Sequence, residues 1–432
     1  MTAISTQPAA DVSAGSARTA AELTRSHKTP IILTVFAVFG VVLFVLLARS
    51  GTTTLDFAGQ GVHTLTIPHL HLPARGTGYV VAVIGVLMAA GAWVLGRGAR
   101  RVPSWYAAIF AVVLLVGFLV WAAAGHTLPL VGLLTGSLAL SAPIIFGALG
   151  GVVSERVGVV NIAIEAQLLA GAFVSALIAS VTHSLIAGVV GAMAASVLVS
   201  FVLGAFAVRY AVDQVIVGIV LNVLVLGLTN FLYQTVLVNS PALNTPATFH
   251  QLPIPGLVQI PILGPILFDQ TIIIYLMYIA VIAVFVGMFK TRWGLRLRAV
   301  GEHPQAADTV GINVPRTRFW NVALAGAIVG VGGAYFTLGS VGAFSQDVTS
   351  GLGYIALAAV IFGKWDPIRA TFAALLFGFA NNLQNVLGII GSPVPSDFML
   401  MLPYVVTIFA VAGLVGRVRG PAASGKPYLG GH

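Results

Sequence analysis

The residues of this chain that could do chemistry are the few polar ones inside long apolar runs. Asn161 and Glu165 stand four residues apart in such a run, and on a helix this spacing places both side chains on one face, about one turn apart. A carboxylate within a membrane-spanning run is costly and is a functional candidate by default. The pair therefore indicates either a polar patch on a path through a membrane or a hydrogen-bonded bridge to a neighbouring helix.

Neutral amides occur in two later apolar runs, at Asn222 and Asn230 in the first and at Asn381, Asn382, Gln384 and Asn385 in the second. Asn side chains commonly link helices within membranes, and the same groups can hydrogen-bond a passing solute. Both interpretations stay open for each residue. The candidate substrate pathway comprises four residues, which are Asn161, Glu165, Asn222 and Asn381.

Motifs for catalysis, nucleotides or metals are weak in this sequence. Gly420–Lys426 fits the first seven positions of a phosphate-binding P-loop, but the eighth is Pro427, where Mg²⁺ coordination needs Ser or Thr. His63, His69 and His71 share one loop, but nothing marks a fourth metal ligand. Cysteine is absent, which excludes a thiolate metal site. We expect no enzymatic activity, no bound metal and no cofactor on this chain.

The composition indicates that lipid surrounds most of the chain. Hydrophobic residues make up 58% of it and charged residues 8%, with a mean hydropathy of +1.01. Soluble domains carry about 25% charged residues, so this chain cannot cover a water-facing surface. A spanning helix needs about 20 mostly apolar residues. The candidate segments are 31–48, 79–96, 104–124, 132–153, 158–181, 185–208, 215–236, 271–289, 319–340, 352–363, 369–390 and 398–416.

The segment 352–363 is too short to span alone. The predicted fold is therefore an all-α polytopic transmembrane bundle with about 10–12 spanning segments, including short or re-entrant helices. Gly326 and Gly330, spaced four apart, favour close helix packing within it.

The basic residues indicate the orientation of the bundle. With the N-terminus inside and the segments alternating, only Arg49 and Arg75 of the 21 Lys and Arg residues fall outside. Cytoplasmic loops carry such an excess, so we expect both termini in the cytoplasm. The net charge of +9 arises from residues between apolar runs, which is typical of a membrane face. We therefore expect a lipid bilayer as partner and no nucleic acid.

Two loops differ in character. The predicted outer loop 237–270 contains six prolines, which forbid a long helix. The predicted inner loop 290–318 mixes basic residues with an Ala-rich stretch that favours a short helix from Pro304 to a stop at Gly311. Such a folded loop indicates a docking site for a partner, and a solvated basic loop is the alternative.

A many-helix protein with a sparse polar interior suits a transporter. Two classes stay open on these grounds, a secondary carrier and the permease of an ATP-driven importer, with a membrane-embedded enzyme third because a catalytic set is lacking. An ion-coupled carrier would usually show more intramembrane carboxylates than Glu165.

Five stretches, in the expected order, resemble the permeases of ABC importers for nucleosides and simple sugars. They are SERVGVVNIAIEAQLLAGAF (154–173), DQVIVGIVLNVLVLGLTNFLY (213–233), LPIPGLVQIPILGPILF (252–268), GLRLRAVGEHPQAADTVGINVPRTRF (294–319) and GLGYIALAAVIFGKWDPIRATFAALLFGFANNLQ (351–384). The resemblance covers roughly 132–416, which is the expected permease core, and it assigns no role to the three-helix extension at 31–131. Residues 1–30 are rich in Ala, Ser and Thr, so we expect a disordered cytoplasmic tail there and a second cytoplasmic tail at 417–432.

The resemblance also implies that the chain lies in the cell (inner, cytoplasmic) membrane and works with several partners. These are two cytoplasmic ATP-binding subunits that hold ATP and Mg, a second permease copy or paralogue, and an extracellular substrate-binding lipoprotein. The loop 294–318 is the one expected to meet the ATPase, which assigns coupling roles to Arg298, Gly301, Glu302, Pro304, Ala307 and Gly311.

The sequence departs from the family pattern at His303, where Asn is usual, and at Ala166, where Gly is usual. His and Asn both form hydrogen bonds, so docking should survive. The resemblance favours nucleosides as cargo, with simple sugars of the ribose type as the alternative and a branched-chain amino acid less favoured. The mechanism implied is alternating access, with ATP hydrolysis in the partner opening a pathway near Asn161 and Glu165.

Overall fold

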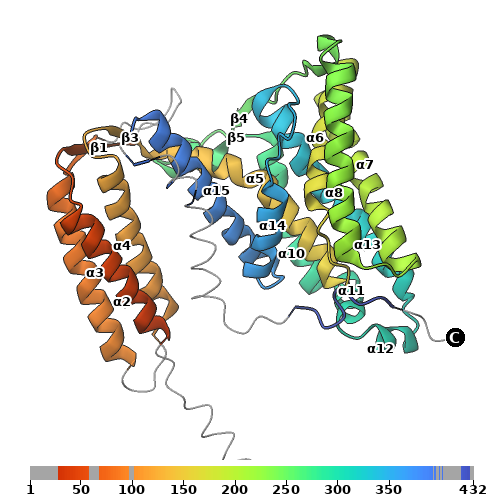
Figure 1. The fold of residues 1–432 in the computed structure, drawn as a ribbon, viewed down its shortest axis with the longest axis horizontal. Helices are drawn as coiled ribbons and strands as arrows, with labels where there is room; N and C mark the ends of the chain where they lie inside the picture. Colours follow the sequence, from red (N-terminus) through yellow and green to blue (C-terminus); the bar gives the residue numbers. More distant parts are fainter. Residues whose placement is uncertain are drawn as a thin grey trace, which may run out of the picture. The chain divides into compact units, whose positions relative to one another are not determined.

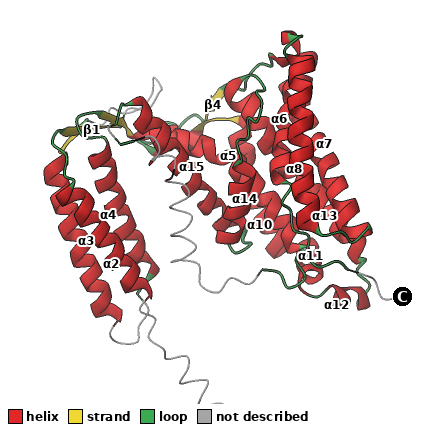
Figure 2. Ribbon diagram, viewed as in Figure 1, coloured by secondary structure: helices red, strands yellow, loops and turns green. Residues whose placement is uncertain are grey.

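The computed structural model describes residues 28–57, 68–96, 102–392, 394, 395, 398, 401 and 420–428. Ten helices in these residues are long and apolar enough to cross a membrane. Strands are limited to short pieces between helices (Figure 2). The predicted all-α polytopic class is confirmed. Most of the predicted segment 398–416 and most of the predicted tail 1–30 lie outside the described residues, whereas 420–428 of the predicted tail 417–432 are described.

The chain forms two compact units. The first comprises residues up to 55, then 69–128 and 390–394, and the second comprises the remainder. The described residues of the first unit form three helices that lie side by side (Figure 1). Its elements are α2 (Lys28–Val41) with the π-helical turn η1 (Val42–Leu46), β1 (Thr52–Asp56), β2 (Leu70–Pro73), α3 (Ala74–Gly96), α4 (Ser104–Ala122) and β3 (Thr127–Pro129).

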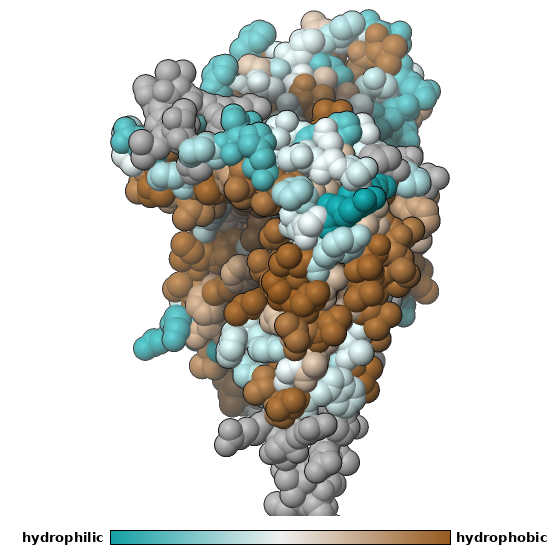
Figure 3. All heavy atoms as spheres, turned by 90° about the vertical axis from the view of Figure 1, so that its left-hand side faces the viewer, coloured by the Kyte–Doolittle hydropathy of each residue, from teal (hydrophilic) through white to brown (hydrophobic). Residues whose placement is uncertain are grey.

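Small residues and a few large ones make the core of the first unit. Ala37, Ala89 and Ala92 pack with Leu33 and Phe110 between the helices. Outward-facing side chains are mostly apolar, so the face formed by these helices is hydrophobic along most of its length and hydrophilic at one end (Figure 3). Lipid is the solvent that suits such a face.

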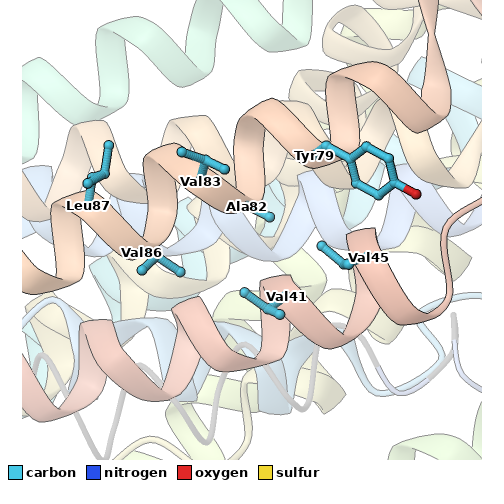
Figure 4. Close-up of a pocket in the computed structure, with 7 residues that line it drawn as sticks. All are labelled: Val41, Val45, Tyr79, Ala82, Val83, Val86 and Leu87. Atoms are coloured by element: carbon cyan, nitrogen blue, oxygen red, sulfur yellow. The ribbon is translucent and has the colours of Figure 1, made fainter.

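A groove of about 360 Å³ runs between α2 and α3 (Figure 4). Its lining offers the Tyr79 hydroxyl as the single side-chain hydrogen-bonding group, so it does not suit a polar solute. The lining residues are Val41, Val45, Tyr79, Ala82, Val83, Val86 and Leu87.

The second unit is a larger bundle. Its long helices are α5 (Leu130–Arg156), α6 (Ile164–Thr182), α7 (Leu185–Gly204) with η2 (Ala205–Arg209), α8 (Gln214–Leu232) with η3 (Tyr233–Leu237), α10 (Ile272–Lys290), α13 (Val314–Ala334) with η5 (Tyr335–Val341), and α15 (Pro367–Ile389). Its short elements are η4 (Pro241–Asn244), β4 (Gln251–Pro253), α9 (Leu263–Phe268), β5 (Asp269–Thr271), α11 (Arg292–Glu302), α12 (Pro304–Thr309) and α14 (Leu352–Phe362).

The predicted close packing at Gly326 and Gly330 is confirmed between α13 and α7. A Cβ on Gly326 would lie 1.9 Å from the Ser200 Oγ, and one on Gly330 would lie 2.6 Å from the Ala192 carbonyl oxygen. Because neither position has room for a side chain, α13 approaches α7 closely along this face. The predicted lack of a long helix in 237–270 is also confirmed, since only η4, α9 and the β4–β5 hairpin form there.

One expectation is wrong at the junction of α5 and α6. A continuous helix was expected over 158–181, with Asn161 and Glu165 on one face, but α6 begins only at Ile164. Residues 157–163 are irregular, and Gly158 has φ +95°, a conformation that glycine adopts without strain. Asn161 therefore precedes the helix that carries Glu165.

Candidate functional site

The Glu165 carboxylate joins α6 to the start of α14. Its Oε1 accepts the Thr349 hydroxyl at 2.5 Å and the Gly351 N–H at 2.9 Å, and its Oε2 accepts the Gly353 N–H at 2.6 Å. The side chain is 8% exposed, so these donors replace water. Both oxygens are engaged within the chain.

The helix α14 is a half-length helix whose N-terminus meets Glu165. Its 11 residues span about 16 Å, roughly half of a bilayer core. An anion at a helix N-terminus is favoured by the helix dipole and by the unpaired N–H groups of the first turn. Gly353 permits this approach, because a Cβ there would lie 2.5 Å from the Glu165 backbone nitrogen.

Asn222 on α8 forms hydrogen bonds with backbone groups on both sides of Glu165. Its Oδ1 accepts the Ala166 N–H at 2.9 Å, and its Nδ2 donates to the Ile162 carbonyl at 2.9 Å. The same Nδ2 lies 3.1 Å from the hydroxyl of Tyr354 on α14. Asn222 thus links three segments, and Tyr354 leaves half of its surface exposed.

Asn161 belongs to a neighbouring set of buried amides. Its Nδ2 donates to the Gln167 Oε1 at 3.0 Å, and the Gln167 Nε2 donates to the Ser200 Oγ at 2.9 Å. Gln214 accepts the Val160 N–H at 2.7 Å. These bonds support the structural interpretation that the sequence left open. Gln167 and Gln214 were missed, although the criterion that selected the asparagines, a polar residue in an apolar run, applies to them equally.

The structure brings together three of the four predicted pathway residues. Asn381 lies on α15, and its neighbour Asn382 makes the buried contacts there, with Nδ2 2.7 Å from the Leu133 carbonyl oxygen. Thr349 was not predicted, because nothing in the sequence marks it as the partner of Glu165.

The loop between α10 and α13 folds into the two short helices α11 and α12. Leu297 and Val300 are fully buried, whereas Leu295 is 61% exposed, so α11 is amphipathic. Gly301 sits directly on the end of α5, since a Cβ there would lie 2.0 Å from the Arg156 carbonyl oxygen. The Arg298 guanidinium lies over the Phe289 ring, 5.1 Å from its centre.

The predicted short helix from Pro304 is confirmed as α12. Pro304 is its first residue, Ala307 is buried, and Gly311 follows with φ +84°. The Ile312 N–H donates to the Ala307 carbonyl at 3.1 Å and closes the helix end. Val310, next to this end, is 75% exposed.

The turn between α14 and α15 is tied to the same end of α5. The Trp365 Nε1–H donates to the Glu155 Oε2 at 2.5 Å, and the Arg156 Nε donates to the Trp365 carbonyl at 2.9 Å. The α14 half-helix is therefore held at both ends, by Glu165 at its start and by Glu155 and Arg156 after its end.

The P-loop-like segment does not form a phosphate cradle. The N–H groups of Ala423 and Lys426 donate to the carbonyls of Gly301 and Ala423, and that of Ser424 donates to Pro421. A phosphate cradle needs such N–H groups free. Within the described residues, no group of three or more His, Cys, Asp or Glu could hold a metal. His63 lies outside these residues, and His71 Nδ1 is 3.0 Å from the Thr54 hydroxyl.

A cavity of about 240 Å³ lies at the N-terminal end of α5, beside α9 and the β4–β5 hairpin. Burial raises the pKa of the Asp269 carboxyl above its ordinary value. The lining residues are Val131, Gly132, Thr135, Gly136, Gln251, Pro265 and Asp269.

The bundle combines many membrane-spanning helices with an irregular break before α6, the half-length helix α14 and a folded loop at one end. This combination is typical of a helical membrane transport protein. Residues 133–411 match the family described as the branched-chain amino acid transport system / permease component, and the chain belongs to this family.

Curated relatives are similar over most of their length. The guanosine ABC transporter permease protein NupQ of Bacillus subtilis is 42% identical over 314 residues, which are 68% of this chain and 95% of the relative. The nucleoside ABC transporter permease protein NupC of Lactococcus lactis is 41% identical over 305 residues, 68% of this chain and 95% of the relative. The putative glucose ABC transporter permease protein TsgC13 of Haloferax volcanii is 32% identical over 261 residues, which are 59% of this chain and 77% of the relative. No solved structure matches the chain.

Proposed function

We propose that this chain is the membrane-spanning permease subunit of an ATP-driven importer that takes up nucleosides. The relatives with 41–42% identity bear the names of guanosine and nucleoside permeases, and they align over nearly their whole length. The observation that carries the proposal is the loop α11–α12, which packs on the bundle with one side and presents apolar residues with the other. Exposed apolar residues of this kind are typical of a protein interface.

The ATP-binding subunits would dock on α11 and α12. Leu295 and Val310 supply the exposed apolar surface, and Arg292 and Arg296 flank it with positive charge. ATP and Mg are bound by those subunits, and this chain supplies the surface on which they act. Arg298, Gly301 and Ala307 keep the two helices on the bundle. Glu302 and Pro304 flank the link between α11 and α12, and Gly311 follows the end of α12.

The orientation follows from the basic residues. Both termini and α11–α12 face the cytoplasm, and the chain lies in the cell (inner) membrane. An extracellular binding lipoprotein delivers the solute to the loops around the β4–β5 hairpin, where the cavity with Asp269 opens. A second permease copy or paralogue completes the membrane part of the importer.

The solute would pass the discontinuous helices. Transporters commonly place their sites where half-helices begin near the middle of the bilayer. Because both Glu165 oxygens are engaged by the first turn of α14 and the loop before it, Glu165 acts as a positioning residue, and Asn161 likewise holds Gln167. Asn222 and the half-exposed ring of Tyr354 are the groups at this point that could bond and stack a nucleobase. Asn381 stays a candidate further along α15.

Two alternatives are less well supported. A simple sugar as cargo is favoured by the 32% identical relative that is named as a putative glucose permease. Ion-coupled transport would need an acid that is free to bind and release a proton or ion. Glu165 instead accepts three hydrogen bonds from its own chain.

Uptake measurements in cells test the proposal. The chain is expressed with its candidate ATP-binding subunits and binding protein in a host that lacks nucleoside uptake, and labelled guanosine, adenosine, uridine, ribose and glucose are supplied in turn. We expect uptake of the labelled nucleosides. An excess of unlabelled nucleoside should reduce this uptake, and an excess of unlabelled sugar should not. Uptake of sugars alone, or uptake that persists without the ATP-binding subunits on an ion gradient, would contradict the proposal.

A further inference from the structure

The C-terminal segment Gly420–Tyr428, called the strap below, lies against the loop that faces the proposed ATPase (Figure 1, dark blue beside α11 and α12). The Ala423 N–H donates to the Gly301 carbonyl at 2.9 Å. The Ala422 N–H donates to the Glu302 Oε2 at 3.2 Å. The strap therefore bonds both residues that end α11.

The strap also reaches α12 and α13. The Tyr428 hydroxyl donates to the Asp308 Oδ2 at 2.8 Å, and the Arg318 Nη1 donates to the Lys426 carbonyl at 2.9 Å. A single segment of chain thus connects the end of α11, the end of α12 and the start of α13. These three elements form the whole of the folded loop and its exit.

Arg318 makes this docking specific. It is 1% exposed, and its Nε and Nη2 have no hydrogen-bond partner in the described part of the chain. Burying a guanidinium is costly unless acceptors surround it, so the Lys426 carbonyl is an acceptor that the arginine needs. A strap that left this position would expose Arg318 to water.

The strap is also in contact with the ends of α5 and α14. A Cβ on Gly158 would lie 3.3 Å from the Ala423 carbonyl oxygen, and one on Gly420 would lie 3.0 Å from the Trp365 ring. Trp365 is the residue that bonds Glu155 at the end of α5. The strap therefore lies where α11, the α5 end and the α14–α15 turn meet.

We infer that the strap is a positioning element, which fixes α11 and α12 in the geometry that couples ATP hydrolysis to movement of α5 and α14. This inference rests on the proposed function and adds to it a regulatory part of the chain. The family match ends at residue 411, so the strap lies beyond it. The segment that resembles a P-loop is thereby given a structural use in place of a nucleotide site.

Cross-linking tests the strap itself. The chain has no cysteine, so introduced pairs report without background. Asp308→Cys with Tyr428→Cys should be joined by a short bismaleimide in membranes that contain the whole complex. Asp308→Cys with Asn239→Cys, just past the end of η3, is the matched control and should stay unlinked. Absence of a link in the first pair, with both cysteines reactive, would contradict the docking of the strap on α12.

Truncation tests its role in coupling. Removing residues 420–432 deletes the strap, and removing 429–432 keeps every contact named above. In the assembled complex we expect the longer truncation to lower nucleoside uptake per ATP hydrolysed by about tenfold or more, with normal membrane insertion, and the shorter one to leave it unchanged. Tyr428→Phe, which loses one hydrogen bond, should lower the same ratio by at most about fivefold.

The outcomes separate the two proposals. A wild-type ratio in the 420–432 truncation would overturn the coupling role while leaving the proposed function intact. Equal loss in both truncations would also overturn it, because the second keeps the strap. If the wild-type complex shows no ATP-driven uptake, the proposed function and the coupling role fall together, and cross-linking still decides whether the strap is docked.

Discussion

The Glu165 carboxylate on α6 accepts the backbone N–H of Gly353 at 2.6 Å, within the first turn of the half-helix α14. This relationship fixes where α14 begins inside the bundle. The same carboxylate accepts Thr349 and Gly351, so the loop before α14 is held as well. The first two predictions below concern this contact.

Glu165→Gln should destabilise the protein without preventing its insertion. The amide has one acceptor oxygen and no charge for the helix N-terminus, so at least one buried N–H loses its partner, at a cost of about 1–3 kcal/mol. Thermal unfolding of the detergent-purified chain measures this loss. Asp347→Asn, an exposed acid of the same loop, is the matched control and should change little. An unchanged unfolding temperature in Glu165→Gln would count against the contact.

Gly353→Ala should displace α14. Its Cβ would lie 2.5 Å from the Glu165 backbone nitrogen, and backbone cannot give way as a flexible side chain can. We expect a lower yield of folded protein and loss of uptake. Gly388→Ala on α15 has nothing within 4 Å of the new Cβ, and it should be neutral or stabilise by up to about 1 kcal/mol. Similar behaviour of both variants would argue against close contact at Gly353.

Two substitutions at Tyr354 distinguish an effect on nucleoside binding from an effect on folding. Tyr354→Phe keeps the ring and loses only the contact with Asn222, which retains its bonds to Ala166 and Ile162. It should leave KM for nucleosides nearly unchanged. Tyr354→Leu removes the ring and should raise KM by about two- to tenfold, the weight of one aromatic stacking contact, with a smaller change in the maximal rate. Equal KM values for Tyr354→Leu, Tyr354→Phe and the wild type would show that Tyr354 does not contact the solute.

Val310→Asp should weaken assembly with the ATP-binding subunits. The side chain is 75% exposed beside the end of α12, so the monomer tolerates the change, but a buried charge at an interface is costly. Co-purification of the subunits reports the loss. Val341→Asp, exposed at the end of η5, is the control and should leave co-purification normal. Full recovery of the subunits with Val310→Asp would place their dock elsewhere.

Glu302→Ala should uncouple ATP hydrolysis from transport while membrane insertion stays normal. The carboxylate is exposed and accepts the Ala422 N–H, so its loss loosens the end of α11 from the strap. The ratio of uptake to ATP hydrolysed is the measurement. Transport at the wild-type ratio would remove Glu302 from the coupling role.

Much of the bundle could be predicted because its signals are local. Apolar length identified ten spanning helices, and the shortness of 352–363 identified α14. Pro304 and Gly311 marked α12, since both act through their own backbone. These features depend on residues close together in the chain.

The site was predicted less well, because its bonds join residues far apart in the chain. The break before α6 could not be seen from a helical spacing, since Gln214 and Asn222 on α8 satisfy the irregular backbone at 157–163. Thr349 and Gly353 meet Glu165 across more than 180 residues. The strap, likewise, was visible only as an incomplete P-loop, because its partners lie on α11, α12 and α13.

Reconstituted transport tests the central claim most directly. The purified chain, its candidate second permease, the ATP-binding subunits and the binding protein are placed in liposomes that contain ATP and Mg, and labelled guanosine is supplied outside with the binding protein. We expect guanosine to accumulate against its gradient only when ATP is present inside. Accumulation without ATP, or with this chain omitted, would contradict the account.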